Sequence, residues 1–259
     1  MTGTSLYCNA AVRRPRRHNS RPQGILIFLR VDRHEESGSA VFTVSLDNAV
    51  QDGFNVDFAT ANRTATAGQD FAATTGTLTF AGTVGETLTI EVPIIDDTVL
   101  ESDETFDLDI SNATKGVVIA DGNGIGAVTD NDTASIRIDD VTVGEGDGTA
   151  VFTVTLDNAV QEGFSVSFTT ADDTATSGQD FTATSGSLSF AGTVGETQTI
   201  EVAITDDTIF DPNETFTVTL SAPTSGVTLS DATAIGTITD NDEDTPAPEL
   251  IFANGFEGD

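Results

Sequence analysis

The sequence predicts an all-β protein made of two tandem immunoglobulin-like antiparallel β-sandwiches of about seven strands each. The segment AVFTVSLDNAVQDGF starts at Ala40 and recurs 110 residues later, at Ala150, as AVFTVTLDNAVQEGF. Within each copy apolar and polar residues alternate, as at Phe42, Val44 and Leu46, which is typical of a half-buried strand. Turn signals rich in glycine, aspartate and asparagine separate these runs at intervals of about 10 residues. The sequence has 16 phenylalanines and no tryptophan, so phenylalanine is expected to fill the core.

The repeat also predicts the domain organisation. A repeat of this length is a duplicated domain, because solenoid units are typically about 20–50 residues long. We expect one sandwich over residues 26–132 and another over residues 133–242, joined by so few residues that their relative freedom is restricted. Residues 1–25 are expected to form a disordered basic leader, and residues 243–259 an acidic tail. The arginines of the leader and the GILIFL after them are also typical of a signal peptide, although no small-residue cleavage site follows.

Composition excludes several classes of partner. The chain has 42 acidic and 10 basic residues, for a formal net charge of -32. Nucleic acid and anionic membranes are not expected as partners, because binding them depends on lysine and arginine. Cys8 is the only cysteine, so neither an intramolecular disulfide nor a cysteine metal cluster can form. The expected partners are cations, although adaptation to high salt would also make a surface acidic.

The acidic residues gather at expected loops and strand ends, in the same order in both copies. In the first copy they are Glu35, Asp70, Asp96, Asp97, Glu101, Asp103, Glu104, Asp130 and Asp132, and in the second Glu145, Asp180, Asp206, Asp207, Asp211, Glu214, Asp240 and Asp242. Loops that follow alternate strands share one end of a sandwich, so these carboxylates should meet there and repel one another. Calcium is the best match, because it accepts six to eight oxygen ligands with loose geometry, whereas zinc prefers histidine or cysteine.

The order EGxxGxAxFTVxL, GxDF, a DD pair followed by ExxETF, and a closing DND resembles the Calx-beta domain. The resemblance implies a seven-stranded sandwich whose distal loops bind Ca²⁺. It implies as calcium ligands Glu35, Asp70, Asp96, Asp97, Glu101, Asp130 and Asp132, and then Glu145, Asp180, Asp206, Asp207, Asp211, Asp240 and Asp242. The first copy departs from the pattern, since HEES stands where the second has GEGD. The closing run is DND in place of three acids, which indicates weaker binding because the site has fewer charges.

Catalytic and sugar-binding interpretations have less support in the sequence. A pair of these acids could serve as a glycosidase acid and nucleophile, but dense like charges favour a metal site. Both histidines, His18 and His34, lie in or beside the leader, so the repeats cannot form a serine or cysteine triad. Tyr7 is the only tyrosine, which disfavours sugar stacking. The segment that contains Gly122 and Gly124 is expected to form a hairpin turn. It is not expected to bind phosphate, because neither the helix nor the lysine of a phosphate-binding loop follows it.

We therefore expect a non-enzymatic, calcium-binding tandem module of a bacterial secreted or cell-surface protein. Calcium would rigidify the acidic loops and the joint between the sandwiches, in a structural or adhesive role. Expected partners are calcium ions and other domains of a longer surface protein or a cell-surface ligand. The alternative is a calcium-sensing regulatory module of a larger protein.

Overall fold

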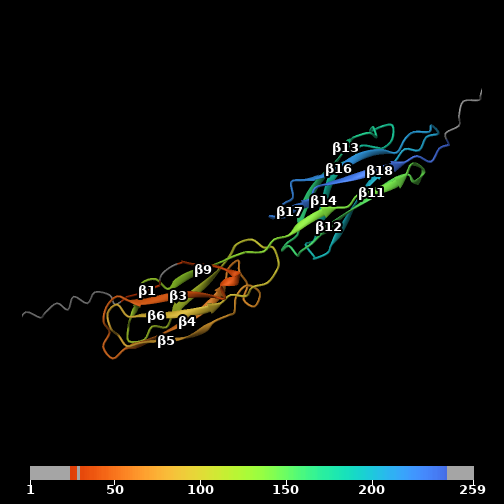
Figure 1. The fold of residues 1–259 in the computed structure, drawn as a ribbon. Helices are drawn as coiled ribbons and strands as arrows, with labels where there is room; N and C mark the ends of the chain where they lie inside the picture. Colours follow the sequence, from red (N-terminus) through yellow and green to blue (C-terminus); the bar gives the residue numbers. More distant parts are fainter. Residues whose placement is uncertain (1–23, 28–29, 244–259) are drawn as a thin grey trace, which may run out of the picture. The chain divides into compact units, whose positions relative to one another are not determined.

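The computed structural model describes residues 24–27 and 30–243 of the chain (Figure 1). Most of the expected leader and tail lies outside these residues. The first strand begins at Gly24, two residues before the start expected for the first sandwich. No helix among the described residues is long and apolar enough to cross a membrane.

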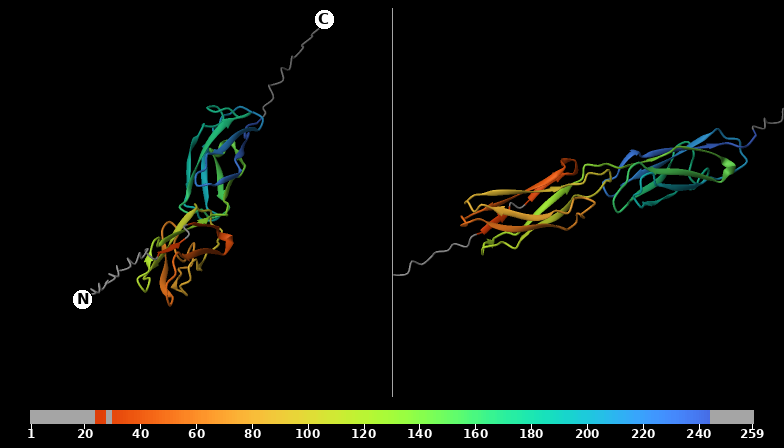
Figure 2. Two further views of the ribbon diagram at one scale, coloured as in Figure 1. Left: turned by 90° about the vertical axis from the view of Figure 1, so that its left-hand side faces the viewer. Right: turned by 90° about the horizontal axis from the view of Figure 1, so that it is seen from below.

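The first copy is a sandwich of two sheets (Figure 2). One sheet has the strand order β6-β3-β1-β8 and the other β2-β9-β7-β4-β5. The strands are β1 (Gly24–Ile27), β2 (Arg30–His34), β3 (Ser39–Leu46), β4 (Phe54–Asn62), β5 (Thr75–Phe80), β6 (Thr87–Pro93), β7 (Glu104–Ser111), β8 (Val118–Ile119) and β9 (Asn123–Thr129). Their inward side chains alternate with outward ones: in β3, every second residue from Ala40 to Leu46 is buried.

The second copy repeats this architecture. Its sheets have the orders β15-β12-β10-β17 and β11-β18-β16-β13-β14. The strands are β10 (Ser135–Ile138), β11 (Val141–Gly144), β12 (Thr149–Leu156), β13 (Phe164–Asp172), β14 (Ser185–Phe190), β15 (Thr197–Ala203), β16 (Glu214–Ser221), β17 (Thr228–Asp231) and β18 (Thr233–Thr239). The predicted all-β class and the two tandem sandwiches are thus confirmed.

The strands that open each copy add a detail to the prediction. The opening chain of the second copy is divided into β10 and β11, which join different sheets, and the interruption falls at Asp139 and Asp140. β10 pairs in parallel with β17, and β11 pairs in parallel with β18. In the first copy, β1 pairs in parallel with β8. Each copy therefore has more strand segments than seven, and its sheets are mostly but not entirely antiparallel.

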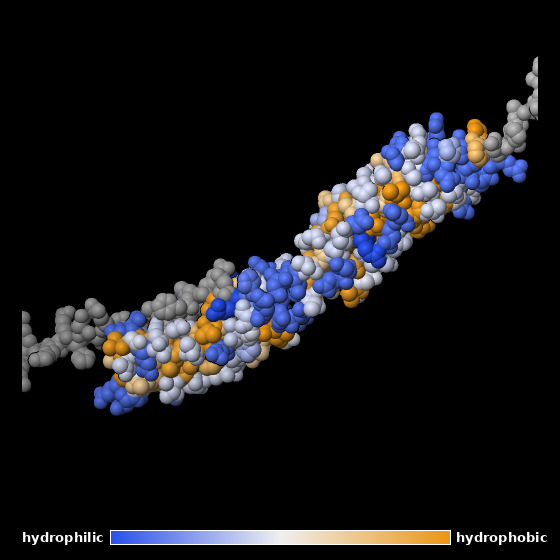
Figure 3. All heavy atoms as spheres, viewed as in Figure 1, coloured by the Kyte–Doolittle hydropathy of each residue, from blue (hydrophilic) through white to orange (hydrophobic). Residues whose placement is uncertain are grey.

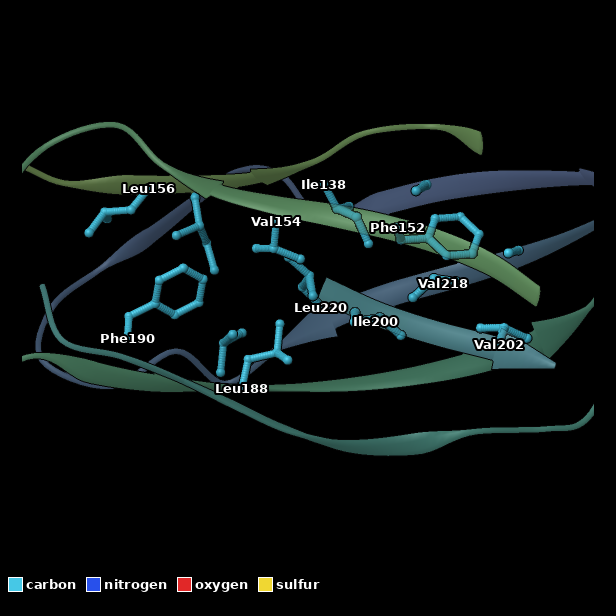
Figure 4. Packing of buried hydrophobic residues seen from close by; sticks show 14 of the residues in the cluster. Ile138, Phe152, Val154, Leu156, Leu188, Phe190, Ile200, Val202, Val218 and Leu220 are labelled. Atoms are coloured by element: carbon cyan, nitrogen blue, oxygen red, sulfur yellow. The ribbon is translucent and has the colours of Figure 1, made fainter. Parts of the chain in front are cut away.

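Phenylalanine fills both cores, as predicted. Phe71 and Phe106 stack with ring centroids 4.4 Å apart, and Phe181 and Phe216 repeat the contact at 4.5 Å. Figure 4 shows the second core, where apolar side chains of both sheets point toward one another between the layers. The last strand of this copy approaches a ring so closely that a Cβ built on Gly236 would lie 2.5 Å from Phe216.

The contacts divide the chain into two compact units that do not coincide with the two repeats. The first unit contains Ser39–Ile94 and Thr105–Ala127. The second contains Val128 and the residues after it, and also the segments His34–Gly38 and Ile95–Glu104. Two acidic segments of the first repeat therefore belong by their contacts to the second unit. The predicted boundary after Asp132 stays a prediction.

Candidate metal centre

The strand ladders of the second copy bring its acidic segments to one end of the sandwich. Gly144 pairs with Thr239 at the ends of the parallel strands β11 and β18, so the residues that follow, Glu145 and Asp240, leave the sheet side by side. Glu214 opens β16 opposite Ile238 of the same β18.

The loop that carries Asp180 is held at this end too. A bridge between Phe181 and Ile204 joins that loop to the segment after β15, and the Thr205 N–H donates to the Asp180 carbonyl at 2.9 Å. The acids that directly follow Thr205, Asp206 and Asp207, therefore lie beside the Asp180 loop.

One carboxylate oxygen from each of Glu145, Asp240 and Asp242 lies within 4.8 Å of the other two. Asp180, Asp211 and Glu214 line a hollow together with Glu145 and Asp240. This end of the second sandwich is therefore a dense group of carboxylates.

Burial and, after it, the charges of neighbouring acids raise the pKa values of carboxyl groups at this end. Burial, followed by the charge of Asp180, raises the pKa of Glu214 above its ordinary value. Burial raises the pKa of Glu145 as well, against a hydrogen bond that it accepts from the Asp207 N–H. Desolvation and the neighbouring Asp240 raise the pKa of Asp242. Ionising all of these groups together is therefore unfavourable without a cation.

The first copy has two such groups. Carboxylate oxygens of Glu35, Asp97 and Asp132 lie within 4.8 Å of one another, and so do those of Asp70, Glu101 and Glu104. Glu35 opens a short 3-10 helix, Glu35–Ser37, and is only 4% exposed. Its burial, together with the charges of nearby acids of which Glu101 is the strongest, raises its pKa from 4.5 to about 7.

Short hydrogen bonds within the loops fix the direction of several carboxylates. Asp97 accepts from the Val99 N–H at 2.7 Å, and Asp207 accepts from the Ile209 N–H at the same distance. Such bonds restrict the conformations of the carboxylate side chain. Less side-chain conformational entropy is then lost when an ion binds.

Asp70 and Asp180 are held in the same way. Asp70 accepts from the Thr66 N–H at 2.5 Å, and Asp180 accepts from the Thr176 N–H at 2.6 Å. Each bond holds one oxygen of the carboxylate and so fixes the direction of the other.

The chemistry of the groups fits calcium. Among the described residues, the buried carboxylate oxygens without a hydrogen-bond partner include Glu35 Oε2, Asp132 Oδ2 and Asp242 Oδ2. A buried acceptor without a donor costs about 1–3 kcal/mol or more, which a bound cation would remove. Every possible metal-ligating atom in the groups is a carboxylate oxygen, the kind of ligand that calcium prefers.

All fourteen sequence-predicted ligands lie in or beside these groups. Eight belong to the three groups of close oxygens. Five others act electrostatically on members of these groups: Asp96 and Asp130 on Asp132, and Asp206, Asp207 and Asp211 on Asp242. Asp180 lines the same hollow as Glu145 and Asp240 and acts on Glu214 there. Individual roles as calcium ligands stay predictions.

The predicted ligand set omitted two residues that the structure places at the site, Glu104 and Glu214. They start the equivalent strands β7 and β16. Both glutamates open the ETF motif, and its recurrence in the two repeats was the signal that could have identified them. A glutamate at the start of a strand is also common on a solvent-exposed surface, so the motif alone does not indicate a ligand.

The first copy differs from the second where the sequence indicated. In the second copy, a Cβ on Gly146 would lie 2.7 Å from Nδ2 of Asn241, and that amide donates to Asp206 at 3.1 Å. Glu36 replaces this glycine in the first copy and is exposed. The close approach of Asn241 to the backbone at Gly146 therefore leaves no room for the side chain that the first copy carries at this position, and the two sites differ in local geometry.

Comparison with known proteins places these observations in a family. The Calx-beta domain matches residues 24–129 and 128–242. The adhesion G-protein coupled receptor V1 of Danio rerio is 29% identical over 225 residues, which cover 80% of this chain and 4% of the receptor. The sodium/calcium exchanger 1 of Rattus norvegicus is 32% identical over 191 residues, 65% of this chain and 19% of the exchanger. The chain thus spans a small part of these relatives.

Among solved structures, the crystal structure of CBD12 from CALX1.2 is similar over 82% of this chain and 99% of that one. The sequence identity is 21% and the TM-score is 0.41.

Proposed function

The chain belongs to the Calx-beta domain family, and on this premise we propose that it is a calcium-binding tandem module whose ions rigidify the acidic loops. The observation that carries the proposal is the convergence of oxygen-only carboxylate groups that contain buried acceptors without donors. A purely solvated acidic surface would leave such acceptors in contact with water.

The ligands proposed for the second copy are Glu145, Asp180, Asp206, Asp207, Asp211, Asp240 and Asp242, with Glu214 added. Those proposed for the first are Glu35, Asp70, Asp96, Asp97, Glu101, Asp130 and Asp132, with Glu104 added. When bound, calcium would supply positive charge, and the carboxylate oxygens would coordinate it. The Asp207 N–H donates to Glu145, at the start of the short 3-10 helix Glu145–Asp147 that follows β11, and Asn241 donates to Asp206. These bonds tie the loops after β15 and β18 to that helix and to each other.

We propose a structural or adhesive role in a secreted or cell-surface protein, with no catalysis. The tandem repeat supports a spacer, and the name of the receptor relative refers to adhesion. Other domains of a longer protein or a cell-surface ligand would be the partners. Extracellular calcium modules typically bind in the range of about 10⁻⁴–10⁻³ M, which suits constitutive stiffening.

A calcium-sensing role is the second candidate, and one observation favours it. The segment with Asp97 and Glu101 also contacts the second repeat, because the Leu100 N–H donates to the Ala159 carbonyl at 3.0 Å. On this interpretation, ion binding in this segment is transmitted to that repeat.

Thermal melting in calcium, magnesium and chelator tests the proposal. Calcium at about a hundredfold excess over its dissociation constant should stabilise the folded form by about 2.7 kcal/mol, which raises the melting temperature by several degrees. Magnesium should do less, because it requires a tighter octahedron. A melting temperature in calcium within about one degree of that in chelator would contradict calcium binding by both copies.

The double variant Asp206→Asn and Asp207→Asn locates the response. It removes two charges from the second site and keeps the side-chain size. Calorimetry should then find a weaker calcium response in the second copy and an unchanged response in the first. The matched variant Asp47→Asn and Asp57→Asn removes two acids outside the site and should keep both responses.

A further inference from the structure

One strand that ends a sheet of the second repeat lacks the features that usually protect such an edge. A strand in this place presents unpaired N–H and C=O groups, which charged residues, proline, a bulge or a short length usually keep from pairing with another chain. The strand β14 ends the sheet order β11-β18-β16-β13-β14. Its sequence, SGSLSF, contains six residues without charge or proline, and it pairs with β13 in unbroken register. β14 is therefore a template for a further strand.

Almost all the other strands that end a sheet among the described residues are protected. β2, β6, β15 and β17 contain charged residues, and β6 also contains Pro93. β8 has only two residues, and β11 has four residues between Asp140 and Glu145. The exception is β5, the counterpart of β14 in the first repeat. β14 and β5 are therefore the candidate edges for pairing with another chain.

The hydrogen-bond pattern shows which residues of β14 face the open edge. The Thr170 N–H donates to the Thr184 carbonyl at 2.9 Å, one residue before β14 begins. In an antiparallel pair, residues that bond to the neighbouring strand alternate with residues that do not. The backbone N–H and C=O groups of Ser185, Ser187 and Ser189 therefore point away from β13. All three serines are exposed, and these backbone groups have no hydrogen-bond partner in the part of the chain that the structure describes.

Two copies of β14 complement each other. When two molecules meet about a two-fold axis at Ser187, their β14 strands run antiparallel and each Ser187 lies opposite the other. Each Ser185 then lies opposite the Ser189 of the other molecule. Every N–H and C=O group that these serines direct to the edge finds a partner, because a bonded pair in an antiparallel ladder exchanges both hydrogen bonds. The hydroxyls of facing serines also match, since each can donate and accept.

The distribution of charge favours a second copy at this edge. Chains that each carry a net charge of -32 repel one another, and Figure 3 shows one face of the molecule on which hydrophilic residues cover broad areas of both repeats. β14 has no charged residue. The residues of β13 that pair with its exposed serines, Ser165, Ser167 and Thr169, are also uncharged. Two molecules can therefore meet at β14 without placing carboxylates opposite one another.

The same edge of the first repeat carries an acid. Thr77 of β5 corresponds to Ser187, and Asp57 of β4 pairs with it where Ser167 stands in the second repeat. The Thr77 hydroxyl donates to the Asp57 carboxylate at 2.7 Å. Two paired copies of β5 would therefore bring a carboxylate from each molecule beside the new ladder. β14 fits a second copy better than β5 does.

We propose that the protein dimerises by antiparallel pairing of β14 with the β14 of a second copy. The five-stranded sheet of the second repeat continues across the two-fold axis into the other molecule. Because both molecules use the same surface, the association closes at two. The dimer goes beyond calcium binding and does not depend on it, since β13 and β14 contain none of the proposed calcium ligands.

Sedimentation velocity tests this dimer from about 10 µM to about 1 mM protein, because a single pair of strands is a small interface that binds weakly. Salt at about 0.3 M screens the repulsion between the chains. Dimers should grow with concentration, and longer species should not appear. Ser187→Pro should remove the dimers, because it removes an N–H directed to the second copy and no bond to β13. Thr77→Pro, at the matched position of β5, should leave them unchanged.

An exchange of charge tests the register. In the proposed ladder residue 187 lies opposite itself, with Cα atoms about 5.5 Å apart. Ser187→Asp and Ser187→Lys should each weaken the dimer, because like charges directly opposite one another are destabilising. An equal mixture of the two variants should form a heterodimer that is about threefold tighter, or more, than the dimer of either variant alone.

Melting curves show first that each variant folds as wild type does. The proposal is overturned if wild type stays monomeric to about 1 mM, or if Ser187→Pro dimerises as wild type does. Loss of the dimer in Thr77→Pro alone would place the contact on β5 and overturn it as well. If Ser187→Pro melts below wild type, the exchange of charge decides, and a mixture that binds no more tightly than the separate variants overturns the proposal.

Discussion

Glu35 combines nearly complete burial with a carboxylate oxygen that has no hydrogen-bond partner. Its pKa is about 7 in the folded protein, because burial and nearby acids disfavour its charge, and 4.5 is the ordinary value. A folded pKa above the unfolded one gives stability that is complete below about pH 4.5 and lost as the pH rises through about 7. Glu35 therefore weakens the metal-free fold at neutral pH.

The first prediction concerns this pH dependence in the presence of chelator. Wild type should lose stability between about pH 4.5 and pH 7, and Glu35→Gln should lose less, because its amide carries no charge at any pH. The measurement is the melting temperature across this range for both proteins. Added calcium should reduce the difference in slope, since it favours the ionised carboxylate. Parallel curves in chelator would contradict the burial of an ionisable Glu35.

Gly236 gives a second prediction at the scale of a residue. A Cβ there would lie 2.5 Å from Phe216 and 2.9 Å from Phe152, and both rings are completely buried. Gly236→Ala should therefore lower the free energy of unfolding by about 1–3 kcal/mol. Urea unfolding measures the change. The control is Ile235→Ala on the solvent side of the same strand, which should change stability by less than about 0.5 kcal/mol, and equal losses would contradict this packing.

The sequence could identify the acids but not their separate environments. The family order of the acidic positions, repeated in both copies, separated the predicted ligands from other acids such as Asp47, which also recurs, as Asp157. The same recurrence could not indicate that Glu35 would be more deeply buried than its counterpart Glu145, which is partly exposed. Burial depends on how loops far apart in sequence pack, and neither periodicity nor spacing contains that information.

At the scale of elements, equivalent loops have different environments. The strands were predictable because inward residues alternate along each of them, as in β3. The division of the opening strand between two sheets was not, because both segments are apolar and either could continue one strand. Likewise, the offset of 110 makes Leu100 and Phe210 equivalent in sequence, although one is buried and the other exposed. The difference arises from the chain that surrounds each loop.

The third prediction compares these two loops. Leu100→Ala should lower the free energy of unfolding of the second unit by about 2–3 kcal/mol, because it removes buried apolar atoms from its core cluster. Phe210→Ala should change stability by less than about 0.5 kcal/mol at dilute concentration, because the ring is half exposed. Guanidinium unfolding at a few micromolar protein measures both. A loss for Phe210→Ala as large as that for Leu100→Ala would contradict the difference in burial.

At the scale of the whole molecule, net charge and metal binding act on the same free energy. The chain carries a formal charge of -32, and this charge destabilises the compact state through self-repulsion. Part of the charge is concentrated in the acidic groups, where oxygens lie within 4.8 Å of one another, and part is spread over strand faces, as at Asp57 and Asp109. Salt screens both parts, whereas calcium neutralises only the first.

This difference gives the last prediction. In chelator, raising sodium chloride from about 20 mM to about 300 mM should raise the melting temperature, because the Debye length falls below the spacing of many surface charges. In saturating calcium the same salt should raise it less, since the closest like charges are already neutralised. Asp206→Asn with Asp207→Asn should reduce the slope in chelator toward the slope in calcium. If the slope is equally steep with and without calcium, the repulsion resides on the strand faces, and the acidity is an adaptation to salt that the metal groups do not govern.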